Sequence, residues 1–309
     1  MSTLLITHPA CLEHLTPLGH PERPDRLRAV EHALEAEKFQ ALARIEAPLA
    51  PFEVIALVHP MDYITSLRDA TPDEGIIHLD ADTPMSPGSF EAGLRAAGGA
   101  IFAVDEVLAK KAANAFVATR PPGHHAETAR PMGFCFFDNA AIAARYAQDH
   151  HGIARVAIVD FDVHHGNGSQ EIFWSDKTVM YCSTHQMPLF PGTGAVGESG
   201  EYNTVVNAPL RPDDGGEKFR DALDSRILPR LNEFQPELVI ISAGFDAHYR
   251  DPLANINLDE VDFTWATQKL MELADRHAGS RVVSLLEGGY DLQALGNSVA
   301  AHVTALMRG

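Results

Sequence analysis

The sequence is poor in cysteine and in basic residues. Its only cysteines, Cys11, Cys135 and Cys182, form no CxxC pair, which argues against a disulfide framework or a thiolate zinc site and predicts buried thiols in a reducing compartment. Lysine and arginine total 24 against 42 acidic residues, for a net charge of -18. Without a basic stripe, direct nucleic-acid binding is not expected. An acidic field instead favours cationic ligands such as lysine side chains or polyamines, or simply belongs to an acidic cytosolic protein.

Long apolar runs and linkers are also missing. No run approaches the ~18 residues of a membrane span, and residues 1–15 lack the basic and apolar regions of a signal peptide. The chain contains no Pro/Gly/Ser linker, low-complexity segment or internal repeat, and 45% of it is hydrophobic. We therefore expect one domain over residues 1–309 with a sizeable core, in a cytoplasmic protein without membrane contact. Homo-oligomers are compatible with this composition.

Short apolar runs rich in β-branched residues alternate with longer helix-like stretches. The expected strands are residues 4–7, 115–118, 156–161, 179–183, 238–242 and 282–286. The expected helices are residues 90–112, 139–150, 217–234, 259–276 and 292–307. This alternation predicts an α/β fold with a central, mostly parallel β-sheet and helices on both faces. Segments 7–26, 70–88 and 186–202 are rich in Pro, Gly and His and are predicted to be long loops at the rim of the sheet.

Reactive side chains follow four of the expected strands. After the run ending at residue 159, Asp160, Asp162 and His164 alternate with apolar residues, so they project to one face of a strand. Burying two carboxylates and an imidazole is costly unless a cation joins them, and a divalent metal is the simplest one. The other three strands lead into segments 120–125, 243–246 and 287–290. Ligands of parallel sheets bind beyond the carboxyl ends of the strands, so we expect one shared site.

The chemistry of these side chains suggests individual roles. Asp162, His164 and Asp246 make a three-ligand set with room for a water molecule, as in catalytic metal sites. The adjacent imidazoles of His124 and His125 follow a stiff Pro-Pro-Gly turn, and Tyr290 follows two glycines and could donate a hydrogen bond to an oxyanion.

Two further residues are plausible partners of the histidines. The carboxylate of Asp160 would raise the pKa of an imidazole, whereas the amide of Asn167 would orient one and leave its pKa nearer neutral. The histidine paired with Asn167 is then the better general base. Taken singly, each feature has a plainer alternative, namely a hydrogen-bonded strand end, a turn cap at Asp246, an exposed histidine pair or a half-buried Tyr290.

Several long motifs together resemble the histone deacetylase superfamily, which includes the acetylpolyamine amidohydrolases and has an arginase-like α/β fold. They span nearly the whole chain: GHPERPDRL, RPPGHHAE, MGFCFFDNAAIAA, VDFDVHHGNGSQEIFW, FPGTG, ISAGFDAHYRDPLA and LLEGGYDL. Asn167 stands where class I enzymes carry Asp. With EGGYDL, it makes the chain similar to the class II branch and its bacterial relatives.

The resemblance implies a zinc-dependent amidohydrolase that removes acetyl or other acyl groups from lysine side chains of proteins or peptides. One Zn²⁺ per chain, or alternatively Fe²⁺, would be held by Asp162, His164 and Asp246. The implied catalytic residues are the pairs His124 with Asp160 and His125 with Asn167, together with the carbonyl-polarising Tyr290. The positions that match the substrate tunnel, its rim and an internal acetate channel are Phe134, Phe190, Asp82, Gly133, Leu253, Gly288 and Arg26. Asp80 competes with Asp82 for the rim position, and His165 has no implied role.

The resemblance also implies that the protein binds potassium (K⁺) at two sites. The matching positions of a first site are Asp160, Asp162, His164, Ser183 and Thr184, and those of a second site are Phe173, Asp176 and Val179.

Three other functions compete with this interpretation. An acetylpolyamine amidohydrolase of the class II type would carry an acidic residue at the position of Leu253, so protein lysine is favoured. A catalytically inactive scaffold that binds acylated ligands would lack a metal ligand or the tyrosine, yet each of these positions is filled. An arginase-like enzyme with two manganese ions needs a DxD pattern, which the segment from Asp246 to His248 does not have.

Overall fold

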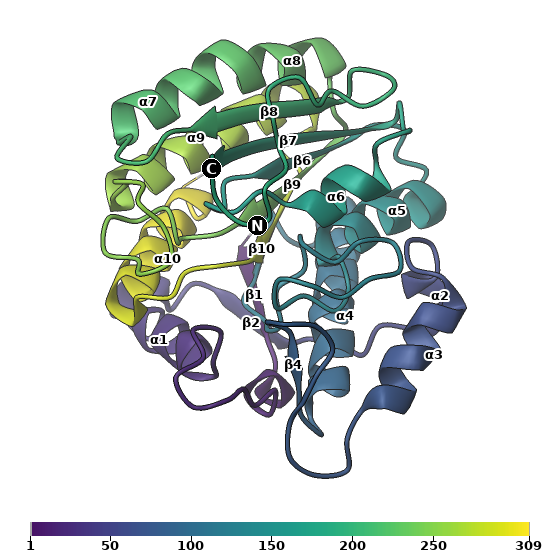
Figure 1. Ribbon diagram of the computed structural model, residues 1–309. Coiled ribbons are helices and arrows are strands. Elements are labelled where there is room, and N and C mark those ends of the chain that lie inside the picture. The colour runs from purple at the N-terminus through teal and green to yellow at the C-terminus, as the bar shows by residue number, and fades with distance from the viewer. Residues whose placement is uncertain (1, 309) are drawn as a thin grey trace.

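A twisted β-sheet runs through the centre of the molecule (Figure 1). The computed structural model describes residues 2–308. The strands of the sheet are β1 (Thr3–Thr7), β2 (Ala43–Glu46), β5 (Asn114–Val117), β6 (Val156–Asp160), β7 (Val179–Gln186), β8 (Val205–Leu210), β9 (Leu238–Ala243) and β10 (Val282–Leu286). Over the described residues they form an eight-stranded sheet in the order β2-β1-β5-β10-β9-β6-β7-β8, and every neighbouring pair is parallel. The predicted α/β class with a parallel sheet is confirmed.

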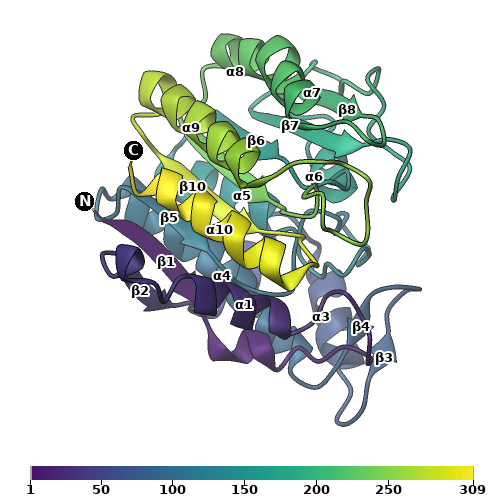
Figure 2. The same cartoon turned by 90° about the vertical axis from the view of Figure 1, so that its left-hand side faces the viewer.

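Helices cover both faces of this sheet. The longer helices are α1 (Asp25–Ala33), α3 (Met61–Ala70), α4 (Ser89–Leu108), α5 (Asn139–His151), α9 (Glu260–His277) and α10 (Leu292–Leu306). The shorter ones are η1 (Pro9–Leu12), η2 (Glu37–Phe39), α2 (Phe52–Ile55), α6 (Asn167–Ile172), α7 (Gly216–Ala222), η3 (Leu223–Ile227) and α8 (Leu228–Phe234). In Figure 2, α1, α9 and α10 lie in front of the strands, and α4 and α5 lie behind them.

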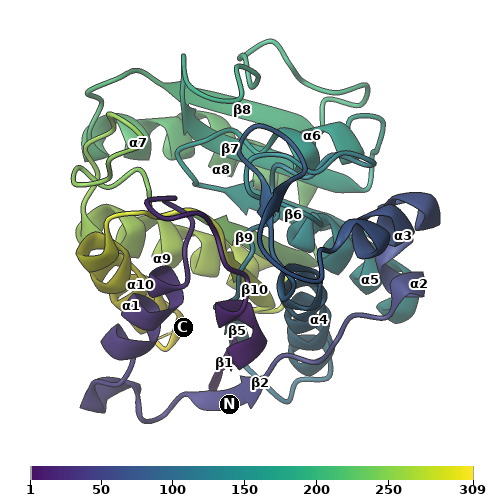
Figure 3. The same cartoon turned by 60° about the horizontal axis from the view of Figure 1, so that its bottom comes forward.

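The alternation of side chains in β6 shows how this layering arises. Ala157 and Val159 belong to the core cluster shared with α9 and α10, whereas Val156 and Ile158 belong to the one shared with α4 and α5. A strand that is apolar on both faces reads as a continuous hydrophobic run, as this one does. A third cluster joins α2 and α3 to the outer side of α4 and α5 (Figure 3).

The sequence-based boundaries fail mainly at the edges of the sheet. The edge strands β2 and β8 were not predicted. An edge strand pairs on one side only and tolerates polar residues and proline, as β8 does with Asn207 and Pro209. The stretch 217–234 is helical as predicted, but its hydrogen-bonding pattern changes along its length. The helix α7 is followed without a break by the π-helical turn η3 and then by α8, which begins next to Pro229. The predicted loops are also more structured than expected: segment 7–26 contains η1, and segment 70–88 contains the antiparallel pair β3 (Ile77–His78) and β4 (Pro84–Met85).

Two expectations from composition can be compared with the structure. Cys11, Cys135 and Cys182 are all buried free thiols. Within residues 2–308, no helix combines the length and the apolar character needed to cross a membrane.

Candidate active site

The four strands that lead into reactive motifs are neighbours at the centre of the sheet, in the order β5-β10-β9-β6. Since all four are parallel, their carboxyl ends lie at one edge. Asp162 and His164 follow β6, and Asp246 follows β9. The ligand atoms of these three buried residues lie within 4.8 Å of one another. The structure therefore brings together the predicted metal ligands.

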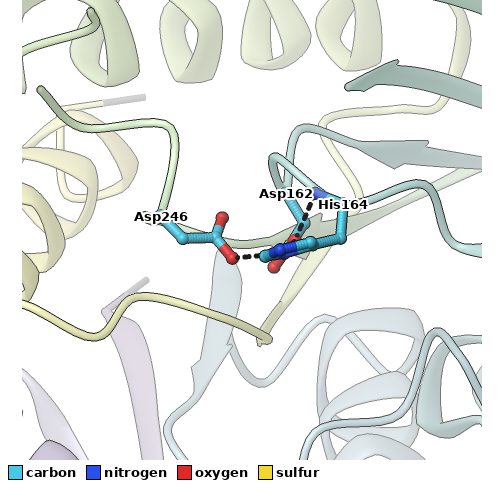
Figure 4. A group of neighbouring side chains, drawn as sticks. All are labelled: Asp162, His164 and Asp246. Carbon is cyan, nitrogen blue, oxygen red and sulfur yellow. Dashed lines mark hydrogen bonds and ion pairs between the residues drawn. The ribbon is translucent and has the colours of Figure 1, made fainter. Parts of the chain in front are cut away.

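The geometry of this metal-ligand cluster is compact. Nδ1 of His164 lies 3.0 Å from Oδ2 of Asp246 and 3.3 Å from Oδ1 of Asp162, and Figure 4 shows both carboxylates turned toward the imidazole. Backbone amides orient the carboxylates: Val163 N–H donates to Asp246 (2.9 Å), and Gly288 N–H donates to Asp162 (2.8 Å).

Gly288 lies against this cluster. A Cβ atom at Gly288 would collide with the carboxylates of both Asp246 and Asp162, so a side chain cannot be accommodated there without moving them. Its contact with substrate stays a prediction.

The donor set of the cluster fits a divalent metal ion. Burial raises the pKa of Asp246, and the charge of Asp162 raises it further. Although burial opposes it, hydrogen bonds to these two carboxylates raise the pKa of His164 to about 10. The cluster therefore favours a positive charge at its centre. Two carboxylates and an imidazole suit zinc or ferrous iron, and three protein ligands leave a coordination position open.

Two buried histidines lie beside the cluster. Nδ1 of His124 lies 2.9 Å from Oδ2 of Asp160, and Nδ1 of His125 lies 2.9 Å from Oδ1 of Asn167. Burial opposes the charged form of His124, but the carboxylates of Asp160 and Asp162 outweigh it and raise its pKa well above the ordinary value. Burial lowers the pKa of His125 well below the ordinary range, and the charge of His124 lowers it further. The pKa values of the two adjacent imidazoles are therefore shifted in opposite directions.

Glu127 fixes the orientation of the Asn167 amide. Nδ2 of Asn167 donates to Oε1 of Glu127 at 2.9 Å, which turns Oδ1 toward His125. A neutral His125 must then donate from Nδ1, so its Nε2 is left as the proton acceptor. Glu127 was missed in the sequence, although it ends the motif RPPGHHAE.

A cavity of about 260 Å³ opens onto these groups. Its lining residues are Asp82, His125, Gly133, Phe134, His164, Leu189, Phe190, Leu253 and Tyr290. They include five of the seven predicted tunnel, rim and channel residues; within residues 2–308, Gly288 and Arg26 lie elsewhere. Leu189 was not predicted. Burial raises the pKa of the Tyr290 phenol well above its ordinary value, so the phenol stays protonated.

Aromatic contacts shape the walls of this cavity. The Phe190 ring meets His125 edge to face with centroids 5.1 Å apart, and Phe134 meets Tyr290 at 6.0 Å. Gly133 has a φ of +57°, and a Cβ there would collide with the His125 ring.

The structure bears on two further predictions, the rim residue Asp82 and the channel residue Arg26. Asp82 accepts a hydrogen bond from Gly133 N–H at 3.2 Å and lines the cavity, whereas Asp80 accepts from backbone N–H groups of its own turn. Asp82 is therefore the better rim candidate. Arg26 is buried behind Tyr290, where its Nε donates to Gly289 O (2.7 Å) and its guanidinium lies 4.9 Å from the centroid of the Tyr290 ring.

The residues that resemble potassium ligands lie in two places. Asp160, Asp162 and His164 lie in or just after β6, and Ser183 and Thr184 lie in β7, where Ser183 is the register partner of Asp160. Of the second set, Phe173 and Asp176 lie between α6 and β7, and Val179 is the first residue of β7. There the Asp176 carboxylate already meets Arg145 at 2.6 Å and accepts from Thr178.

His165 has different hydrogen-bond partners from His164. Its Nδ1 lies 2.7 Å from Thr193 Oγ1, and its Nε2 lies 3.0 Å from Gln170 Oε1. It thus ties the loop that carries Phe190 to α6.

The sequence profile described as the histone deacetylase domain matches residues 20–306. The chain belongs to the histone deacetylase family. It is 40% identical over 302 residues to the rice (Oryza sativa subsp. japonica) protein "Histone deacetylase 10, chloroplastic", covering 91% of this chain and 68% of that one. It is 40% identical over 277 residues to the "Histone deacetylase-like amidohydrolase" of Pseudomonas aeruginosa, covering 88% and 73% of the two chains.

The crystal structure of the HDA15 HD domain superposes on this chain with a TM-score of 0.93. Its sequence identity is 34%, and the match covers 99% of this chain and 88% of that one. The arrangement of the sheet is therefore that of a histone deacetylase domain, and the family indicates a hydrolase of the amidohydrolase type.

Proposed function

We propose that this histone deacetylase family member is a zinc-dependent lysine deacetylase that hydrolyses acyl-lysine side chains of proteins or peptides to a free amine and a carboxylate. One observation carries the proposal: His164, His125 and Tyr290 together line one cavity. An extended acyl-lysine side chain could place its amide among these three groups.

The proposed chemistry assigns one task to each side chain. A metal ion held by Asp162, His164 and Asp246 would act as a Lewis acid and lower the pKa of a bound water. Nε2 of His125 accepts the proton of the attacking water and returns it to the leaving amine. His124, kept protonated by Asp160, adds positive charge beside the developing oxyanion. The Tyr290 phenol donates a hydrogen bond to that oxyanion.

The cavity walls favour acyl-lysine over acetylpolyamine. Phe134, Leu189, Phe190 and Leu253 are apolar and suit the aliphatic stem of a lysine side chain. Beyond the amide, a polyamine carries an ammonium group that needs a partner once it is desolvated. Among the lining residues, Asp82 alone has a carboxylate, and its Oδ1 already accepts from Gly133 N–H.

The test compares two substrates on enzyme loaded with one zinc ion per chain, with acetate release as the readout. We expect kcat/KM for an acetyl-lysine peptide to exceed that for N-acetylputrescine at least about tenfold, because an unpaired ammonium costs more than about 1.4 kcal/mol. Leu253→Glu should move the ratio toward N-acetylputrescine, whereas the uncharged control Leu253→Met should not. Better turnover of N-acetylputrescine by the wild type would make polyamine hydrolysis the function. No turnover of either substrate would refute the deacetylase proposal.

Three finer proposals accompany this one. The native metal is zinc, with ferrous iron as the alternative, and reconstitution of the apoenzyme with each metal distinguishes them. Potassium binds near Asp160 and Ser183, where the buried Oγ of Ser242, the register partner of Asp160 in β9, has no hydrogen-bond partner among the described residues. Activity in potassium against sodium buffers tests that site. The protein acts in the cytoplasm, in keeping with its buried free thiols.

A further inference from the structure

Asp251 is a buried carboxylate that the proposed chemistry does not use. It lies in the connection between β9 and α9, five residues after the metal-ligand candidate Asp246, and is 7% exposed. It is not part of the cavity lining formed by the described residues. A buried carboxylate is costly unless its oxygens are hydrogen-bonded, so its partners indicate its purpose.

The partners of Asp251 belong to two different loops of the site. Its Oδ2 accepts from Tyr290 N–H at 2.7 Å and, more weakly, from Asp291 N–H at 3.4 Å. Its Oδ1 accepts from Leu253 N–H at 3.0 Å. Both Tyr290 and Leu253 line the cavity. One carboxylate therefore joins the backbone of the loop that carries Tyr290 to the backbone of the cavity-lining residue Leu253.

We propose that Asp251 is a positioning residue. It holds the Tyr290 phenol and the cavity-lining residue Leu253 in the positions that the reaction requires. This inference rests on the proposed function. The bond to Leu253 could be an ordinary local turn. The bond to Tyr290 spans 39 residues and joins two different strand ends, which a local turn does not explain.

The chemistry of the side chain supports a carboxylate in particular. Each of its two oxygens accepts from a different loop, and both bonds are strongest when the carboxylate is ionised. An asparagine has one acceptor oxygen, so its NH₂ group would face a backbone N–H on one of the two sides. The loops would separate there, and misplacing a reacting group by about 1 Å can cost about 10²-fold in rate.

The test is a double-mutant cycle between Asp251→Asn and Tyr290→Phe on the zinc-loaded enzyme with an acetyl-lysine peptide. We expect Asp251→Asn to lower kcat about 10- to 100-fold, and Asp251→Ala to lower it further. In the Tyr290→Phe background, Asp251→Asn should lower kcat less than about threefold, because the phenol it positions is gone. Arg250→Ala is the matched control. It removes an exposed ion pair with Asp291 that joins the same two loops, and it should leave kcat unchanged.

A second measurement separates positioning from other roles. Amide hydrogen exchange should become faster at Tyr290 and Leu253 in Asp251→Asn, while elemental analysis still finds one metal ion per chain. If Asp251→Asn does not fold, Asp251→Glu, which keeps the charge but moves it by one methylene, must show the same coupling to Tyr290.

Several results would overturn the inference. These are an unchanged kcat in Asp251→Asn, independent effects of the two substitutions, or loss of the metal. If the wild type hydrolyses no acylated substrate, the proposed function fails separately, and hydrogen exchange alone decides: unchanged protection at Tyr290 then refutes the positioning role.

Discussion

The hydrogen bond between His125 and Asn167 leads to a prediction about the pH profile. The amide oxygen of Asn167 should influence the pH at which activity falls on the acid side. Replacing the amide oxygen that faces Nδ1 of His125 at 2.9 Å by a carboxylate should raise the pKa of His125 by about 1 to 3 units. Asn167→Asp alone would set two carboxylates side by side, because Glu127 lies 2.9 Å from the same side chain. The designed variant is therefore Asn167→Asp with Glu127→Gln, whose amide can donate to the new carboxylate.

The direction of the effect follows from the role of a base. His125 accepts a proton only when neutral, so activity falls as the pH drops through its pKa. Burial holds that pKa well below the ordinary value in the wild type, and the double variant should move the acid limb of kcat/KM upward by about 1 to 3 pH units. The assay is peptide hydrolysis from pH 5 to 9, with Glu127→Gln alone as control. An acid limb that stays in place would show that His125 is not the base that sets it.

Two further predictions concern the metal-ligand cluster and the core. Gly288→Ala should displace the carboxylates of Asp162 and Asp246 and reduce bound metal measured by elemental analysis, whereas Gly197→Ala, which has open space around it, should bind metal normally. Buried His302 lies between the hydroxyls of Thr267 and Ser284, and burial lowers its pKa to about 3. Because the unfolded chain takes up this proton below pH 6.5 and the folded protein does not until about pH 3, stability present at high pH is lost as the pH falls. The loss is about 2 kcal/mol at pH 5 relative to pH 7.5. Urea unfolding of His302→Gln should lack that part of the pH dependence, and an identical pH dependence in variant and wild type would contradict it.

The sequence predicts the centre of this fold better than its edges. The strands β5, β6, β9 and β10 are continuous apolar runs because both faces of each are covered, and each ends in a polar motif. Parallel strands bring such motifs to one edge, so the cluster of Asp162, His164 and Asp246 could be expected. The order of the strands could not be derived from their composition, and neither β2 nor β8 carries a comparable pattern.

The residues that hold the site residues in place were not predicted, for a different reason. Glu127 and Asp251 contact segments distant in the chain: Glu127 meets Asn167 40 residues later, and Asp251 meets Tyr290 39 residues later. A local sequence pattern does not reveal a contact with a segment so far along the chain. Only the folded chain distinguishes these carboxylates from the many that lie on the surface.

Hydrogen bonds between segments that are distant in the sequence join the loops of the site. Each carboxylate accepts a backbone N–H from the loop of another strand, and the pairs are Asp246 with Val163, Asp162 with Gly288, Glu287 with Gly123, and Asp251 with Tyr290. The loops after β5, β6, β9 and β10 are therefore joined pairwise, with two of the acceptors also serving as candidate metal ligands. Donors and charges fixed in this way need little rearrangement when charge develops in a reaction, which is the condition for electrostatic stabilisation of a transition state. The same arrangement means that removing one carboxylate disturbs two loops at once. An Asp to Asn substitution keeps the shape of the side chain but loses one acceptor oxygen, so double-mutant cycles are needed to separate ligand chemistry from the positioning of neighbouring loops.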